Sequence, residues 1–320
     1  MNYYNSYKFK QFYFLVIKLT IIFGASYFIY QKLLHNDALS WAAFKAQLQE
    51  YHLLNYQVIF VLLAFTTGNW LLEIFKWQYL VNTRQYISFK KAATQSLSAH
   101  AASIVTPNKI GEYGAKALYF KQNKKQLMLL NFIGNAMQLA ATISFGIVGF
   151  LFLTNTFEIA IPYQKIARIL VYFLVFIFGL FKINSSRKSY FFGFSAQKFK
   201  QSLKIISKKQ LLFVFLIAVL RYVIFSSQFY YLLLLFDIDL SFFQSFVLSS
   251  SMYLISAMIP MLGLFDFVIK GAVAVWLFEK IGVSPETTLS ITTIMWLFNF
   301  VFPTLLGFYG VFNYSKKQQL

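Results

Sequence analysis

The sequence predicts an all-α, polytopic membrane protein with six full transmembrane helices and two broken helical hairpins arranged as an inverted repeat. Its residues are 58% hydrophobic and only 12% charged, and the mean hydropathy is +0.59. A soluble domain carries about 25% charged residues, so this composition excludes a soluble protein of 320 residues. Long apolar runs and two similarly interrupted apolar regions indicate the number and type of the helices.

Six apolar runs are long enough to cross a hydrocarbon core of about 30 Å. They lie near residues 13–32, 55–76, 127–153, 165–181, 210–236 and 285–313. Lys8 and Lys10 precede the first run, and no small-residue cleavage pattern follows it. We therefore expect a retained membrane anchor there and not a removed signal peptide.

The net charge of +19 comes from basic residues that gather in short loops between the apolar runs. The loop at 182–209 contains eight basic residues and no acidic one, which places it in the cytoplasm by the positive-inside rule. This distribution indicates a membrane and no nucleic acid as the partner. Both termini are then cytoplasmic, and we expect the bacterial inner membrane. The loop can also hold anionic lipid headgroups at the surface, although topology alone accounts for it.

Two apolar regions, 92–122 and 241–280, are each interrupted in the middle and predict helical hairpins. The arm at 92–105 would be about 21 Å long as a helix, which is too short to span, so we expect a re-entrant hairpin that enters from the cytoplasm. The arms of the second region are nearly long enough to cross. Since two crossings restore the same side, loop charges leave its placement open, and we favour re-entrance by analogy with the first region.

The two interruptions have similar residue types at matching positions. Proline lacks an amide hydrogen and disfavours a helical conformation in the residue before it, so it stops the first arm, and asparagine can cap the second. The predicted helix breaks are Pro107, Asn108, Gly111, Pro260 and Gly263. An acid then precedes a base by four residues, as Glu112 with Lys116 and as Asp266 with Lys270. Such pairs share one face of a helix.

Adding about 153 to each predicted element of residues 1–160 gives an element of residues 161–320. Each half contains three spans and one hairpin, so the second half starts on the opposite side of the membrane and the halves are inverted. The chain is then a single membrane domain over 1–320, with the organisation of many secondary transporters. Chance alignment of apolar segments is the alternative, and the matched acid–base pairs argue against it.

The second arm of each hairpin would begin inside the membrane, with free backbone amides and a positive dipole end. Two such ends that face one another make an anion site near the midplane, and we expect it to bind the phosphate of a lipid headgroup. The candidate phosphate-binding residues are Lys109, Lys116, Arg221 and Lys270, with Glu112 and Asp266 as paired acids. The alternative is that each pair only neutralises itself, because unpaired charges in a membrane are costly. Arg221 can equally tie to an acid, and for Glu73 and Lys76 we favour a structural ion pair near the membrane boundary.

No catalytic residue, metal site or cofactor is predicted. The sequence has no cysteine, no serine nucleophile motif, no HExxH and no phosphate-binding loop. The three histidines, His35, His52 and His100, are scattered along the chain, and we interpret them as interfacial or packing residues.

Three segments carry a resemblance to a known family: TPNKIGEYGAKALYF at 106–120, IPMLGLFDFVIKGAVAVW at 259–276 and NFVFPTLLG at 299–307. Together with the order of the spans, they make essentially the whole chain resemble the lysylphosphatidylglycerol synthase transmembrane-domain family, also described as flippase-like membrane proteins. The chain departs from the family pattern at Lys116 and Lys270, where arginine is usual, and at Asp266, where glutamate is usual. Lysine keeps the charge but loses bidentate phosphate geometry.

The resemblance implies a role in binding or translocating lipids with phosphate headgroups. It does not imply synthase activity, because aminoacyl transfer in two-domain members belongs to a soluble C-terminal domain, and we expect none in a chain that ends soon after its last span. The leading hypothesis is a flippase-like or transporter-like protein that binds an anionic or phosphate-bearing lipid between its hairpins. The alternatives are a membrane-embedded transferase for a lipid headgroup or polyprenyl phosphate, and a noncatalytic membrane partner of such an enzyme. A partner enzyme or a homo-oligomer is therefore also open.

Overall fold

The computed structural model describes residues 40–104, 111–157, 190–191, 194–195, 206–258 and 266–313, and these residues are almost entirely helical. The predicted all-α class is confirmed. Four described helical stretches are long and apolar enough to cross a membrane, namely Tyr56–Asn82, Lys124–Leu153, Lys208–Leu235 and Pro285–Val311. They correspond to four of the six predicted spans, and the runs at 13–32 and 165–181 lie outside the described residues. The count of six therefore stays a prediction.

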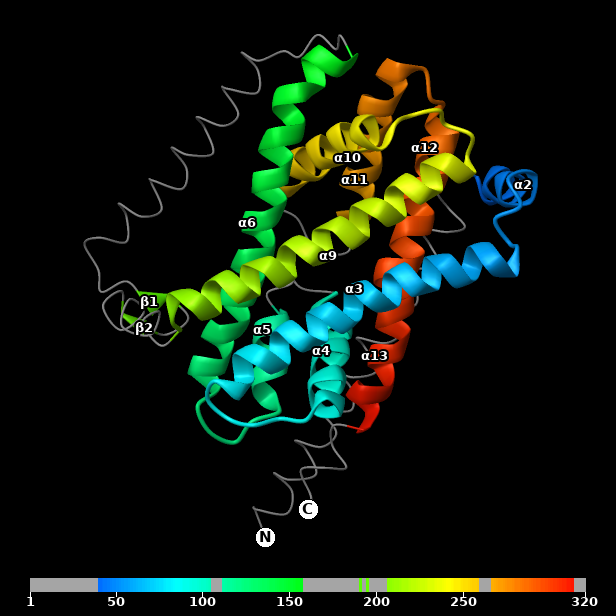
Figure 1. Cartoon of the computed structure of the whole chain (residues 1–320). Coiled ribbons are helices and arrows are strands. Elements are labelled where there is room, and N and C mark those ends of the chain that lie inside the picture. Colours follow the sequence, from blue (N-terminus) through cyan, green and yellow to red (C-terminus); the bar gives the residue numbers. More distant parts are fainter. Residues whose placement is uncertain are drawn as a thin grey trace.

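Helices α3 (Tyr56–Asn82) and α9 (Lys208–Leu235) lie side by side and run in opposite directions (Figure 1). Both start at a capped N-terminus: the Asn55 side chain caps α3, and Ser207 forms a capping box with Gln210 at the start of α9. With 27 and 28 residues, each helix is about 40 Å long. A bilayer core of about 30 Å can contain them only when they are tilted.

The last predicted span is one continuous helical stretch in three parts, α12 (Pro285–Trp296), the π-helical turn η3 (Leu297–Val301) and α13 (Phe302–Asn313). Pro303 lies inside this stretch and cannot donate a hydrogen bond to the carbonyl oxygen of Asn299. The chain accommodates it through the π turn, in which the Phe302 amide bonds to the Leu297 carbonyl oxygen. The Asn299 carbonyl oxygen instead accepts a hydrogen bond from Trp70 Nε1 at 3.4 Å. The proline therefore opens the helix locally without ending the span.

Each interrupted region forms a pair of short helices. The first pair is α4 (Phe89–Ser103) and α5 (Gly111–Leu118), and the second is α10 (Phe242–Ala257) and α11 (Asp266–Phe278). The first arms have 15 and 16 residues and are about 24 Å long at most, which is shorter than the bilayer core. The described part of α5 begins at Gly111, which is one of the predicted breaks. The remaining predicted breaks, Pro107, Asn108, Pro260 and Gly263, and the candidate Lys109 lie outside the described residues, and re-entrance stays a prediction.

The first arm of each hairpin packs against the last span of the other half of the chain. Helix α10 contacts α6 (Lys124–Phe157), and α4 contacts α13. Glycines make both approaches close: a Cβ atom added to Gly149 would overlap Ser250 Oγ, and one added to Gly310 would overlap Ser98 Oγ. Small residues allow such close helix contacts in a membrane. The two contacts are equivalent under the predicted repeat.

Gly307→Ala should lower the unfolding free energy by about 1–3 kcal/mol through overpacking. A Cβ atom on Gly307 would overlap the backbone carbonyl of Leu97 in α4, which no side-chain rotation can relieve. Thermal unfolding in detergent micelles measures the effect as a lower midpoint. Gly114→Ala in α5 is the matched control, because nothing lies within 4 Å of its added Cβ atom. Equal midpoints for the two variants would contradict tight packing between α4 and α13.

Short elements complete the described chain. They are α2 (Trp41–Glu50), the 3-10 turn η2 (Glu279–Ile281), and the antiparallel strands β1 (Tyr190–Phe191) and β2 (Phe194–Ser195). The two strands fall within the predicted loop at 182–209, where the sequence indicates only a connection.

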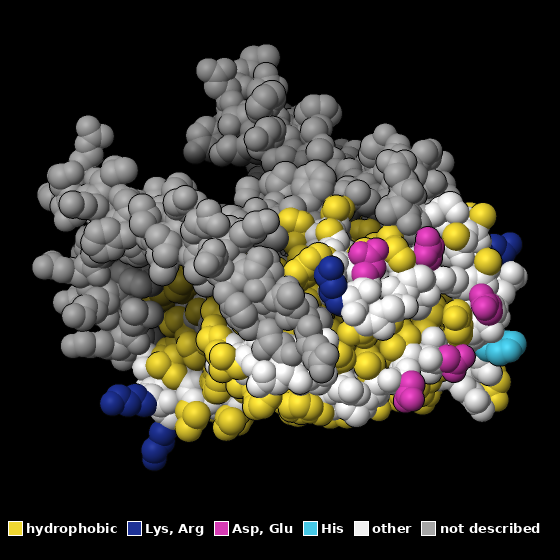
Figure 2. All heavy atoms as spheres, turned by 90° about the horizontal axis from the view of Figure 1, so that it is seen from above, with side chains coloured by type: hydrophobic (Ala, Val, Ile, Leu, Met, Phe, Trp, Pro, Cys, Tyr) yellow, Lys and Arg dark blue, Asp and Glu magenta, His cyan; other side chains and the backbone are white. Residues whose placement is uncertain are grey.

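Charged side chains separate toward two ends of the helices. Basic residues occupy the end where α3 finishes and α4, α6 and α9 begin, at Arg84, Lys90, Lys91, Lys121, Lys124, Lys125, Lys208 and Lys209. Most of the described acidic residues occupy the opposite end, at Glu50, Asp237, Asp239, Glu279 and Glu286, together with Lys45 and Lys280. Figure 2, a view from above, shows Asp and Glu side chains on its right side among hydrophobic ones, with Lys and Arg side chains beside them and at its lower left. The positive-inside rule favours a cytoplasmic basic end.

Candidate functional site

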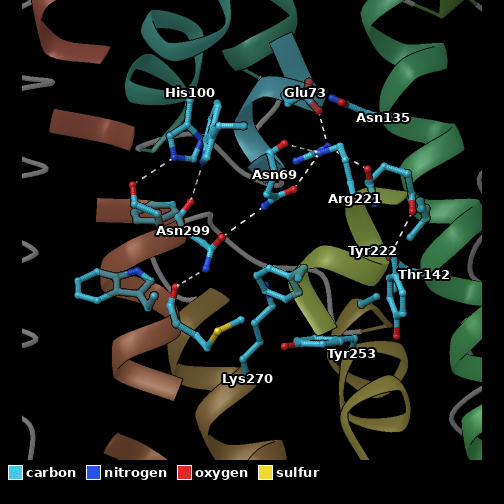
Figure 3. Close-up of a pocket in the computed structure, with 18 of the residues that line it drawn as sticks. Asn69, Glu73, His100, Asn135, Thr142, Arg221, Tyr222, Tyr253, Lys270 and Asn299 are labelled. Atoms are coloured by element: carbon cyan, nitrogen blue, oxygen red, sulfur yellow. Dashed lines mark hydrogen bonds and ion pairs between the residues drawn. The ribbon is translucent and has the colours of Figure 1, made fainter. Parts of the chain in front are cut away.

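A cavity of about 750 Å³ lies between α3, α6, α9, both hairpins and the last span. Its volume is in the range of small-molecule binding sites. Side chains from α3, α4, α5, α6, α9, α10, α11, α12 and η3 line it, and many of them are aromatic. Figure 3 shows the polar members from opposite walls turned toward this space. Both hairpins therefore contribute to one cavity, as the predicted anion site requires.

Arg221, in the middle of α9, holds three neighbours on one wall of the cavity. Its Nη1 atom forms an ion pair with Glu73 Oε2 and donates to Gln138 Oε1 at 2.9 Å. Its Nε atom donates to the Asn69 side-chain oxygen at 3.0 Å. The Arg221 side chain is 15% exposed. Among the described residues, its Nη2 atom has no hydrogen-bond partner.

Glu73 in α3 is the centre of a buried ion-pair network. Besides Arg221, Lys76 Nζ lies 2.6 Å and Lys116 Nζ lies 3.6 Å from its carboxylate oxygens. Lys116 also pairs with Glu112 at 2.7 Å. The sequence-based ion pairs Glu73–Lys76 and Glu112–Lys116 are thus present. Three cations and two carboxylates give this network a net charge of +1.

Lys116 is enclosed by protein groups. Its side chain is 1% exposed, Nζ donates to Asn131 Oδ1 at 2.9 Å, and the ammonium lies 4.8 Å from the Trp77 ring centroid. A lysine over an aromatic face gains a cation–π interaction. Because Lys116 does not line the cavity, direct contact with a ligand there would require it to leave Glu112.

The other sequence-predicted site residues divide into two groups. Glu112, Arg221 and Lys270 line the same cavity, although Arg221 and Lys270 belong to different elements, α9 and α11. Asp266 begins α11, but its side chain is not among those described, so its pairing with Lys270 stays a prediction. Figure 3 shows Lys270 on the opposite side of the cavity from Glu73.

His100 is a packing residue in the cavity wall. Its ring centroid lies 4.9 Å from that of Trp70 and 5.1 Å from that of Phe300, both at steep angles. Its Nε2 atom is 3.4 Å from the Phe300 carbonyl oxygen. The described residues contain no group of three His, Cys, Asp or Glu side chains that could hold a metal ion.

Four amide side chains are functional candidates that the sequence reasoning missed. Asn69 Nδ2 donates to Asn299 Oδ1 at 3.3 Å, and Asn299 Nδ2 donates to Gln228 Oε1 at 2.8 Å. With the Arg221–Gln138 bond, the amides tie α3, α6, α9 and η3 together. The sequence did contain a signal for these residues, because uncharged amide side chains deep inside apolar spans need hydrogen-bond partners within the protein.

These contacts pair equivalent positions of the two predicted halves. Asn69 and Arg221 are 152 positions apart and contact each other. Gln138 and Asn299 are 161 positions apart. Gln138 bonds to Arg221 and Asn299 bonds to Asn69, so each amide contacts the other half of the chain. A contact between equivalent residues is expected where a pseudo-two-fold axis passes between α3 and α9.

Comparison with known families agrees with the predicted resemblance. The family model described as Lysylphosphatidylglycerol synthase TM region matches residues 15–307. The match includes both interrupted regions and three of the four helical stretches long enough to span, and it covers the fourth, Pro285–Val311, up to residue 307. No curated protein sequence and no solved structure gives a significant match.

Proposed function

Because the chain belongs to the lysylphosphatidylglycerol synthase TM region family, we propose that it is a flippase-like membrane protein that binds a lipid phosphate in its central cavity. The phosphate would lie between the two broken hairpins, with Arg221 on one wall and Lys270 on the other. Lys116 and Glu112 would fix the first hairpin beside this site, and Lys109, next to the first break, stays a candidate for phosphate contact.

The observation that carries the proposal is the arrangement of Arg221. Three protein oxygens fix its guanidinium through Nε and Nη1, while Nη2 has no partner among the described residues and the side chain borders the cavity. A planar guanidinium donates well to phosphate oxygens. The buried network carries a charge of +1, and a phosphodiester carries one negative charge. In a medium of low dielectric constant, this match favours binding.

An inverted repeat would allow such a site to open to either side of the membrane. The halves 1–160 and 161–320 would exchange positions around an axis through the Asn69–Arg221 contact, which places the cavity at their interface. Secondary transporters with inverted repeats bind substrate at such an interface and open it alternately to each side. The equivalent packing of α4 on α13 and of α10 on α6 supports this interpretation.

Phosphatidylglycerol should bind the detergent-solubilised protein, whereas diacylglycerol, which lacks the phosphate, should bind at least tenfold more weakly, a difference of about 1.4 kcal/mol. Trp70 and Trp296 line the cavity, so intrinsic tryptophan fluorescence can report the titration. Lys270→Gln should weaken phosphatidylglycerol binding by about tenfold because the variant removes a cation from the wall.

The matched control is Lys90→Gln, which removes the same charge at an exposed position near the start of α4. Its affinity for phosphatidylglycerol should stay within twofold of that of the unmodified protein. Equal affinities for phosphatidylglycerol and diacylglycerol would overturn the phosphate site. If the two lysine variants weaken binding equally, the lipid is attracted by overall charge and not by the cavity.

A further inference from the structure

The ion-pair network is unusual in how its cations share one carboxylate. Arg221, Lys76 and Lys116 all lie within ion-pair distance of Glu73. Glu112, by contrast, pairs with Lys116 and with no other described cation. Glu73 therefore has more cationic partners than a carboxylate needs to stay ionised.

The three cations differ in what they can reach. Lys76 is 2% exposed and Lys116 is 1% exposed, and neither lines the cavity. Arg221 is 15% exposed and lines the cavity together with Glu73. Moving either lysine away would leave a buried charge without compensation, at a high free-energy cost. Only Arg221, of these three, can exchange Glu73 for a ligand while it remains in place on its helix.

We propose that Glu73 is an internal counter-ion that pairs with Arg221 in the empty cavity and releases it to the phosphate of an entering lipid. This inference rests on the proposed function and adds a specificity-determining residue to it. When Arg221 turns to the phosphate, Glu73 keeps Lys76 at 2.6 Å and Lys116 at 3.6 Å. The carboxylate therefore stays paired in both states, and the negative phosphate compensates Arg221.

Competition by Glu73 has two consequences for a transporter. It lowers the affinity of the cavity for phosphate, so a bound lipid can leave again. It also discriminates against headgroups without a phosphate, because a neutral hydroxyl cannot displace a carboxylate from a guanidinium.

The exchange also links ligand binding to the contact between the halves. Arg221 in α9 bonds to Asn69 and Glu73 in α3 and to Gln138 in α6. Loss of the Glu73 bond removes one of the ties between α9 and the first half. Lipid binding would thus favour relative movement of the two halves, which alternating access requires.

Glu73→Gln should tighten phosphatidylglycerol binding by about tenfold, measured by tryptophan fluorescence in detergent, since it removes the competing charge and keeps the side-chain shape. Glu286→Gln is the matched control, because Glu286 is exposed in the first turn of α12, does not line the cavity and makes no ion pair with Arg221. Its affinity should increase by less than threefold. Equal increases in the two variants would show a general field effect and would overturn the counter-ion role.

A second variant covers the case in which Glu73→Gln does not fold. The double substitution Glu73→Gln with Lys76→Gln keeps the network charge at +1 and still frees Arg221, so it should also bind phosphatidylglycerol more tightly than the unmodified protein. If this double variant binds no more tightly while Arg221→Gln binds more weakly, the counter-ion role is wrong and the phosphate site stands. If Arg221→Gln binds as well as the unmodified protein, the phosphate site itself is wrong.

Discussion

Replacing Arg221 with glutamine should lower the rate of phospholipid movement across reconstituted vesicles by about 100-fold, which corresponds to about 2.7 kcal/mol. Arg221 is the cation that combines a place in the cavity wall with three fixed hydrogen-bond partners. Its loss removes the guanidinium that would face the phosphate and leaves Glu73 with two lysines. The measurement is the rate at which a fluorescent phosphatidylglycerol in the inner leaflet becomes accessible to an external quencher.

Arg84→Gln is the appropriate control for this prediction. Arg84 is exposed just beyond the end of α3, at the basic end of the molecule, and it does not line the cavity. The control variant should move lipid at a rate within twofold of the unmodified protein. Full activity of Arg221→Gln, with normal folding, would remove the central element of the proposed mechanism. A partner enzyme or a purely anchoring role would then become the better interpretation.

Much of the fold follows from local patterns in the sequence. The runs at 55–76, 127–153, 210–236 and 285–313 are long and apolar, and each coincides with a helix of the structure. Glu112 and Lys116 are four residues apart, so helix geometry alone predicts their pairing, and the structure has it at 2.7 Å. A contact between residues of the same helix can therefore be predicted from their spacing in the sequence.

Contacts between distant helices could not be assigned in this way. Arg221 and Glu73 are 148 positions apart, and the sequence offered several acids as partners for the arginine. The partner is selected by the packing of α3 beside α9, which brings both Asn69 and Glu73 to Arg221. Glu73 therefore belongs to the cavity wall. Its expected position near the membrane boundary had suggested only a local ion pair with Lys76.

At Pro303, a residue type that usually ends a helix does not end the last span. Proline inside a helix usually breaks or kinks it, and the sequence predicts such breaks at Pro107 and Pro260, which lie outside the described residues. At Pro303 the helix continues, since the π turn and the Trp70 indole compensate the missing bond. The difference depends on what packs beside the proline, which a single sequence does not reveal.

Lys116→Met tests whether the buried lysine is structural, and it should lower the unfolding free energy by about 3–5 kcal/mol. The variant leaves Glu112 without its cation, and it leaves Asn131 Oδ1 without the donor at 2.9 Å. Unfolding in detergent, followed by circular dichroism against increasing denaturant, gives the free energy. A residue that served only a ligand would show a much smaller loss in the absence of lipid.

The double variant Glu112→Leu with Lys116→Met tests whether Lys116 acts as a member of the ion pair or as a positive charge near the lipid. Replacing both members of a buried ion pair by apolar residues is often neutral, whereas removing one strands the other. The double variant should therefore recover more than half of the stability lost in Lys116→Met, and Glu73 would still be paired with Lys76 and Arg221. Recovery of stability together with retained lipid binding would assign Lys116 to the support of the first hairpin. Recovery of stability with loss of binding would show instead that its charge acts on the lipid through Glu73, even though its side chain does not line the cavity.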